Sequence, residues 1–226
     1  IEQRGYQVTS EMIQRAFVRS WDIVRREQII EGYDRGPRGH VLLITRFLEL
    51  PPEIELQDEL LRAYTSVLLQ IPPVLIEGAV EVLEYLASRY RIGLICNTGA
   101  TPGSVLRNFI QEQGLMQYFG VLVFSDEVVW AKPNSAVFAY ALERLGDRNL
   151  KAVHVGDDPL TDVIGARKSG LKAAWFAPGA SWPVPECTWH LKSLLEIKNP
   201  VKRGCGVGSQ ECDGRAGMGD AGQGSG

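Results

Sequence analysis

The sequence predicts an α/β fold in which helices cover both faces of a parallel sheet, with an all-helical region in front of it. Short apolar segments alternate with helical periodicities over residues 76–197, which is the pattern of parallel strands joined by helical crossovers. Residues 1–75 carry helical periodicities instead. Pro72 and Pro73 lie between the two regions and interrupt the helical pattern.

The N-terminal region contains three helical segments. Apolar residues recur at helical spacing through residues 10–25, with Thr9 or Ser10 as the N-cap. A second apolar segment, residues 40–50, follows the turn RGPRG, and a third covers residues 54–70. These segments predict that the region is helical throughout.

Four strands and four helices are predicted in the region that follows. Strands that alternate with helices along the chain form parallel sheets, and such sheets are covered on both faces. We therefore expect a Rossmann-like core, whose ligands bind at the carboxyl ends of its strands. The predicted strands are residues 91–96, 121–124, 151–155 and 172–176, and the predicted helices are residues 77–89, 102–113, 133–146 and 160–169.

Composition argues against several classes of function. The 226 residues carry a net charge of −3 and no basic cluster, so we expect no nucleic-acid partner. No apolar run approaches the ~18 residues of a membrane span, and the first residues lack the basic and apolar regions of a signal peptide. The four cysteines show no metal-ligand spacing. We expect a cytoplasmic protein with no membrane partner.

The last residues, 198–226, differ in composition from the rest of the chain. Nine of the 24 glycines lie between Gly204 and Gly226. A segment with so little apolar surface has almost nothing to bury. We therefore expect a disordered glycine-rich tail.

A cluster of carboxylates follows the strand predicted at residues 151–155. The stretch VGDDPLTDVIGARKSG contains Asp157, Asp158 and Asp162. Asp158 precedes Pro159 and suits the N-cap of a helix, where Asp162 would lie in the first turn. Capping leaves Asp157 unexplained, and three neighbouring carboxylates repel one another unless a cation or raised pKa values relieve them. Both a helix cap and a metal site are consistent with this stretch.

Two other turns lie at the same predicted edge of the sheet. Asn97, Thr98 and Gly99 follow the strand at residues 91–96, and Lys132 precedes Pro133 at the start of a helix. Asn, Thr and Gly are common turn residues, but their polar groups also suit a phosphate. Lys132 is either a surface charge or a side chain aimed into the site by the restricted backbone before proline. Together the three stretches are suited to binding an anion beside a divalent cation.

This ordered set resembles the haloacid dehalogenase superfamily of hydrolases, in the subgroup whose helical cap follows the first strand. The resemblance covers about residues 1–195 and is strongest over 92–176. It depends on the stretches IGLICNTG, FSDEVVWAKPNSAVFAYALERLG and VHVGDDPLTDVIGARKSG. By this resemblance, residues 1–75 are a helical cap and residues 76–197 are the Rossmann-like core, with residues 198–226 as a tail.

The resemblance also implies a role for the charged residues. Lys132 matches the lysine that steadies the nucleophile and the transferred phosphoryl group. Asp157 matches the acidic ligand of Mg²⁺, and Asp162 matches the second acidic residue, which binds the ion directly or through water. The implied cofactor is therefore Mg²⁺.

The phosphate-binding turn departs from the family pattern. Cys96 stands where the family usually has a Ser or Thr that donates to the phosphate. A thiol is a weak donor, so Asn97, Thr98 or backbone amides would have to compensate.

The family's first motif, a strand ending in Asp-x-Asp, does not occur in this sequence. In the family, its first Asp is the nucleophile and its second is the acid/base. Because the sequence opens with Ile1, we expect a fragment that lacks a leading segment and a central strand and is inactive as given. The full-length protein is expected to be a Mg²⁺-dependent phosphatase that acts on a small phosphorylated metabolite through an aspartyl-phosphate.

Two alternatives stay open. A 2-haloacid dehalogenase is found on the same scaffold but needs no divalent cation, so the acidic cluster argues against it. A non-catalytic binding or regulatory protein is favoured by the missing motif and by Cys96. Of the three histidines, His154 lies in a predicted strand, where we expect a hydrogen-bonded core residue and not a metal ligand.

Overall fold

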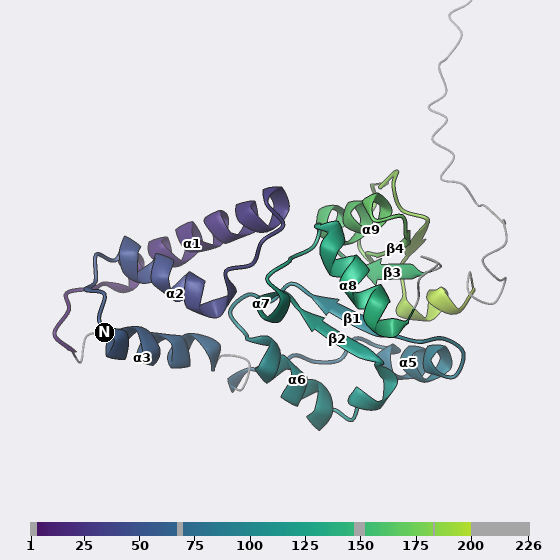
Figure 1. Ribbon diagram of the computed structural model, residues 1–226, viewed down its shortest axis with the longest axis horizontal. Helices are drawn as coiled ribbons and strands as arrows, with labels where there is room; N and C mark the ends of the chain where they lie inside the picture. The colour runs from purple at the N-terminus through teal and green to yellow at the C-terminus, as the bar shows by residue number, and fades with distance from the viewer. Residues whose placement is uncertain (1–3, 67–69, 147–151, 183, 200–226) are drawn as a thin grey trace, which may run out of the picture.

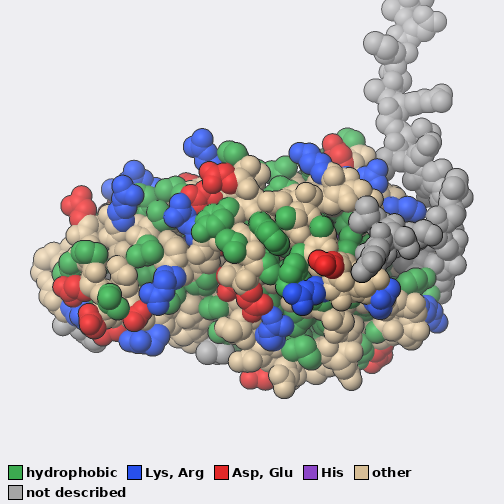
Figure 2. All heavy atoms as spheres, in the orientation of Figure 1, with side chains coloured by type: hydrophobic (Ala, Val, Ile, Leu, Met, Phe, Trp, Pro, Cys, Tyr) green, Lys and Arg blue, Asp and Glu red, His purple; other side chains and the backbone are tan. Residues whose placement is uncertain are grey.

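The computed structural model describes residues 4–66, 70–146, 152–182 and 184–199 of the chain. Most of the predicted glycine-rich tail lies outside the described residues. Among those described, no helix is both long and apolar enough to cross a bilayer. On the face shown in Figure 2, acidic and basic side chains are interspersed over the helical end and the sheet end alike.

The N-terminal region is helical, as the sequence predicts. Its helices are α1 (Ser10–Ile30), α2 (Gly36–Phe47) and α3 (Ile54–Thr65), and they lie together at one end of the molecule (Figure 1). Thr9 caps α1, because its side chain accepts a hydrogen bond from Met12 N at 3.2 Å. α2 packs between α1 and α3.

The strands are all parallel and belong to two separate sheets. β1 (Gly93–Cys96) pairs with β2 (Val121–Phe124) in one sheet. β3 (Val153–Gly156), β4 (Lys172–Phe176) and β5 (Trp189–Leu191) form the other in that order. The predicted α/β class is confirmed, whereas β5 lies in a segment that the sequence analysis did not assign to a strand.

Within the described residues, β1 and β3 each have one edge that pairs with no other strand. The two sheets lie next to each other (Figure 1), yet no ladder joins them. Val155 of β3 is 38% exposed, which is unusual for an apolar residue in a parallel sheet. Hydrogen-bonded pairing of the parallel strands is therefore interrupted between β1 and β3.

Helices cover both faces of the larger sheet. Ala173 and Trp175 of β4 belong to an apolar cluster with α8 (Ser135–Leu145) and α9 (Gly165–Lys168). Ala174, between them, belongs to a second cluster with α5 (Ala79–Ala87) and the short helix η4 (Leu194–Ile197). Because neighbouring strand residues point to opposite faces, β4 is buried on both.

The remaining helices connect the strands. α6 (Gly103–Glu112) and the 3₁₀ turn η2 (Met116–Tyr118) lie between β1 and β2. The one-turn helix α7 (Ser125–Val128) follows β2, and the π-helical turn η3 (Pro159–Ile164) leads from β3 into α9. These turns bring the candidate site residues to the carboxyl ends of the strands.

Candidate active site at the carboxyl ends of the strands

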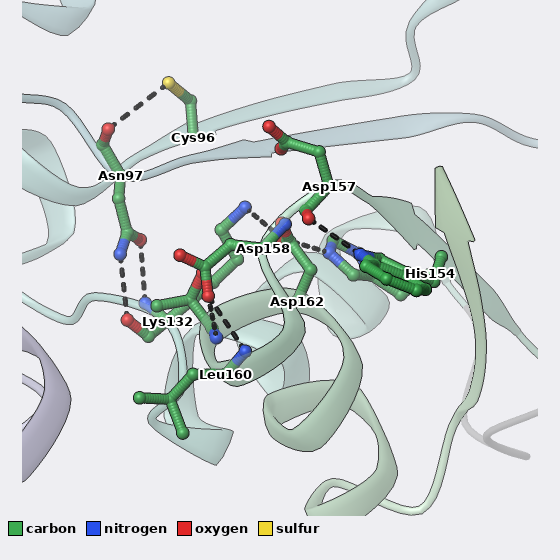
Figure 3. Close-up of polar contacts among 10 residues, drawn as sticks. Cys96, Asn97, Lys132, His154, Asp157, Asp158, Leu160 and Asp162 are labelled. Atoms are coloured by element: carbon green, nitrogen blue, oxygen red, sulfur yellow. Dashed lines mark hydrogen bonds and ion pairs between the residues drawn. The ribbon is translucent and has the colours of Figure 1, made fainter. Parts of the chain in front are cut away.

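Three side chains converge at the carboxyl end of β3 (Figure 3). Lys132 Nζ lies 2.6 Å from Asp162 Oδ1, and His154 Nε2 lies 2.8 Å from the same oxygen. The backbone N–H of Asp158 donates to the other oxygen, Oδ2, at 3.0 Å. The Lys132 and Asp162 side chains are only 11% and 5% exposed. Asp162 is thus a buried carboxylate whose two oxygens are both hydrogen bonded.

The loop sequence explains this placement of Asp162. Asp158 is the N-cap of η3, and its Oδ1 accepts hydrogen bonds from Leu160 N at 2.8 Å and Thr161 N at 2.9 Å. The predicted capping role of Asp158 is therefore confirmed. A Cβ at Gly156 would lie 2.2 Å from Asp162 Cγ, so only glycine leaves room for the carboxylate.

Burial and charge set the protonation of the cluster. Burial alone would raise the pKa of Asp162, but the hydrogen bond from His154 and the charge of Lys132 hold that pKa well below its usual range. Burial lowers the pKa of His154 in spite of its bond to Asp162. The neutral imidazole therefore carries its proton on Nε2 and donates it to the carboxylate.

Asn97 fixes the backbone of Lys132. Its side-chain Nδ2 donates to Lys132 O at 2.8 Å, and Lys132 N donates to its Oδ1 at 2.7 Å. Cys96, one residue earlier, has its sulfur 3.6 Å from Asn97 O, and burial raises the pKa of its thiol. The Asn97 amide, predicted to bind phosphate, is thus committed to the loop that carries Lys132.

Thr98 is completely buried and bonded to protein groups. Its Oγ1 donates to Asp34 Oδ2 at 3.2 Å, and its backbone N–H donates to Ser125 Oγ at 2.7 Å. Asp34 comes from the loop between α1 and α2. A phosphate contact by Thr98 stays a prediction that would require this hydroxyl to change partner.

Asp157 is exposed and lies apart from the buried cluster. Its carboxylate points away from Lys132 and Asp162 in Figure 3, while its backbone oxygen accepts the indole N–H of Trp175 at 2.8 Å. No group of three His, Cys, Asp or Glu side chains among the described residues is arranged to hold a metal ion. The structure brings together two of the predicted residues, Lys132 and Asp162, and leaves Asp157 separate.

Sequence reasoning did not identify His154, Asp34 and Ser125 as members of the site. A signal for His154 was present, because strand residues two apart share a face. His154 and Gly156 are such a pair in β3, and Asp162 packs against Gly156. Asp34 and Ser125 carried no comparable local signal.

The sequence of this chain is similar to those of known hydrolases. The model of the haloacid dehalogenase-like hydrolase family matches residues 36–176. Pyrimidine 5'-nucleotidase YjjG of Escherichia coli is 36% identical over 129 residues, which are 54% of this chain and 54% of that protein. Phosphoserine phosphatase of Thermus thermophilus is 33% identical over 114 residues, 50% of this chain and 45% of that protein. The chain thus spans about half the length of the curated relatives it matches.

Solved structures share the fold at lower identity. The 2-haloacid dehalogenase of Pseudomonas syringae has a TM-score of 0.65 and 22% identity, and the match covers 87% of this chain and 82% of that one. The HAD-hydrolase YfnB of Bacillus subtilis, in a magnesium-bound crystal structure, has a TM-score of 0.61 and 17% identity, with 89% and 86% covered. Because the family model spans more than half of the 226 residues, this chain belongs to the haloacid dehalogenase-like hydrolase family.

Proposed function

We propose that the protein to which this chain belongs is a phosphatase for a small phosphorylated metabolite. The observation that carries the proposal is the buried ammonium of Lys132, 2.6 Å from Asp162 at the carboxyl ends of the strands. A cation held at that edge can neutralise the negative charge that a phosphoryl group carries in the transition state. Relatives at 36% and 33% identity are named a nucleotidase and a phosphatase, which supports phosphate esters as the substrate class.

The nucleophile would come from a strand that lies between β1 and β3. Both strands are parallel members of their sheets, and each offers an unpaired edge within the described residues. An extended segment between them would satisfy the backbone groups of both edges. Because the carboxyl ends of parallel strands meet at one edge of a sheet, an aspartate at its end would lie beside Lys132. Its carboxylate would attack phosphorus and break the P–O bond to the alcohol of the ester, which leaves with a proton. Water would then hydrolyse the aspartyl-phosphate, releasing inorganic phosphate and restoring the carboxylate.

Lys132 would neutralise charge on the transferred group, and its neighbours would keep it in place. Asp162 accepts its Nζ–H, and Asn97 binds its backbone on both sides. With both of its oxygens already engaged, Asp162 orients the lysine and reaches a cation at most through water. The neutral His154 holds Asp162 in turn.

The described residues could supply part of the ligand set of a Mg²⁺ ion. Mg²⁺ binds through one or two carboxylates and fills its other positions with water and substrate phosphate. Asp157 supplies an exposed carboxylate with no hydrogen-bond partner among the described residues. When bound, the ion would add positive charge opposite the phosphoryl oxygens. In this proposal Asp157 is the direct ligand.

The test uses this chain carrying a leading apolar strand that ends in Asp-x-Asp. Phosphate release from pyrimidine nucleoside monophosphates, phosphoserine and short sugar phosphates is measured with Mg²⁺ and with EDTA. We expect Mg²⁺-dependent release, which Asp157→Asn and Lys132→Met abolish. Asp58→Asn, in α3, where the carboxylate pairs with Arg38, is the matched control and should leave the rate unchanged.

Two results would contradict the proposal. Halide release from 2-chloropropionate that is insensitive to EDTA, without phosphate release, would identify a dehalogenase. No turnover of any ester by a folded, strand-carrying protein would favour a non-catalytic binding protein on the same scaffold.

A further inference from the structure

We propose that Asp34 is a positioning residue that ties the helical region to the two turns around Lys132. The proposal has two parts. The first is structural, namely that Asp34 sets the position of the Lys132 backbone. The second, that this position governs the rate, rests on the proposed phosphatase function.

Asp34 is buried, at 3% exposure, and its carboxylate accepts four hydrogen bonds from uncharged donors among the described residues. Its Oδ1 accepts the backbone N–H of Gly36 at 2.7 Å. Its Oδ2 accepts the Ser125 hydroxyl, the Thr98 hydroxyl at 3.2 Å and the Gln28 amide at 3.4 Å. These donors come from α1, the start of α2, the turn after β1 and the start of α7. One carboxylate therefore joins four separate elements.

The two hydroxyls that contact Asp34 also accept backbone N–H groups. Thr98 N donates to Ser125 Oγ at 2.7 Å, and Asp126 N donates to Thr98 Oγ1 at 3.1 Å. The ionised carboxylate of Asp34 can only accept, so each hydroxyl donates its single proton where it bonds to Asp34. The two hydroxyl oxygens also lie 3.1 Å from each other. Two backbone amides thus act on Asp34 through two buried hydroxyls.

The loop between α1 and α2, which contains Asp34, also runs along the segment that ends at Lys132. Asp34 N donates to Val129 O at 2.9 Å, and Ala131 N donates to Gly32 O at 2.9 Å. Between these bonds, the loop and the segment form an antiparallel bridge. The backbone just before Lys132 is therefore held by the loop that Asp34 anchors.

A second connection reaches Lys132 from the other side. Asn97, which binds both backbone groups of Lys132, is next to Thr98 in the chain. Thr98 is fixed by Asp34 and Ser125. Releasing Asp34 would therefore loosen both supports of Lys132 at once.

The electrostatics of Asp34 fit a positioning role better than an ion-pair role. Burial raises the pKa of Asp34, while the hydrogen bonds from Ser125, Gly36 and Thr98 oppose that rise. The neighbouring Arg35 forms its ion pair with Glu27 and not with Asp34. A buried carboxylate without a cation is costly, and its four donors offset that cost only in this arrangement.

The first test measures amide hydrogen exchange in the chain as it stands. Asp34→Asn keeps the shape of the side chain but replaces one accepting oxygen by an amide NH2 group, which cannot accept from the donors it faces. We expect the amides of Thr98, Asp126 and Lys132 to exchange roughly tenfold faster or more, because local opening becomes easier. Glu27→Gln is the matched control, since it removes the charge that pairs with Arg35, the next residue of the same loop. It should leave those three amides unchanged.

The second test measures catalysis in the strand-carrying form that releases phosphate. We expect Asp34→Asn to lower kcat by about tenfold while KM stays within about twofold, because Lys132 acts in the transition state. Glu27→Gln should change neither value. A general loss of folding in Asp34→Asn would instead make amides exchange faster throughout the chain and not only at Thr98, Asp126 and Lys132.

The outcomes separate this proposal from the proposed function. If Lys132 exchanges at its original rate in Asp34→Asn, the positioning role is overturned whatever the activity. If its exchange is faster and kcat is unchanged, the link to catalysis is overturned. If no form releases phosphate, the proposed function fails while the exchange result still decides the structural role. Should Asp34→Asn not fold, Ser125→Ala removes one donor and is judged by the same Lys132 amide.

Discussion

Two carboxylates of the same loop should differ sharply in their contribution to stability. Asp162 accepts hydrogen bonds from Lys132, His154 and the backbone of Asp158, whereas Asp157 is exposed and its side chain has no hydrogen-bond partner among the described residues. Asp162→Ala would leave the Lys132 ammonium, 11% exposed, without its partner. Removing one member of a buried ion pair costs about 3–5 kcal/mol.

The contacts of Asp162 place the expected loss of unfolding free energy within that range. The lysine has no other carboxylate partner among the described residues, so its charge would have to move toward solvent or be lost. The His154 donor and the Asp158 amide lose an acceptor as well, at about 1–3 kcal/mol for each buried group left unpaired. Relaxation of the loop offsets part of this sum. We expect a loss of about 4 kcal/mol for Asp162→Ala and under about 0.5 kcal/mol for Asp157→Ala.

Urea unfolding followed by tryptophan fluorescence measures the difference. For a slope of about 2 kcal/mol per molar urea, a loss of about 4 kcal/mol moves the midpoint by about 2 M. The double variant Lys132→Met/Asp162→Leu should recover most of this loss, because it removes both charges. Equal midpoints for Asp157→Ala and Asp162→Ala would show that the buried pair does not form.

Two further predictions concern Gly156 and His40. Gly156→Ala should lower the free energy of unfolding by about 1–3 kcal/mol, because its Cβ would lie 2.2 Å from Asp162 Cγ. Gly179→Ala is the control, since nothing lies within 4 Å of a Cβ at that position. Equal unfolding midpoints for the two variants would contradict this reasoning. Burial lowers the pKa of His40 to about 4, below the ~6.5 of an unfolded histidine, so protonation favours unfolding. Stability should fall as the pH drops from about 6.5 to about 4, by at most about 3 kcal/mol. The melting temperature of His40→Phe should be less sensitive to pH over that interval, and an identical pH dependence would refute this.

The positions of the first four strands, β1 to β4, could be predicted because each is a short apolar run between turn residues. The runs predicted at residues 121–124 and 172–176 coincide with β2 and β4. The helix predicted at residues 160–169 is instead a π-helical turn, Pro159–Ile164, followed by α9. The spacing of apolar residues does not distinguish an α-helix from a π-helical turn over so few residues. β5, only three residues long, is too short for periodicity to reveal.

Part of the site followed from the sequence and part did not. Lys132 and Asp162 come together because each follows the carboxyl end of a parallel strand, β2 and β3, in two sheets that lie next to each other. The contacts of Asp34 join residues 64 and 91 positions away, Thr98 and Ser125. No local pattern marks a loop aspartate for such distant partners. Its role depends on how the loop between α1 and α2 meets the turn after β1 and the start of α7, which only the folded chain defines.

The charges of the cluster explain why the two metal-ligand candidates are not equivalent. Lys132 and Asp162 form a buried pair of zero net charge, and the lowered pKa of His154 keeps the imidazole neutral. A cation brought to Asp162 would have to compete with an ammonium already 2.6 Å away, and the two positive charges would repel each other. Asp157 has no such competitor, and its exposed carboxylate pays little desolvation on binding an ion. A divalent cation at this edge should therefore lose far more affinity from Asp157→Asn than from any change to the Lys132–Asp162 pair that leaves the fold intact.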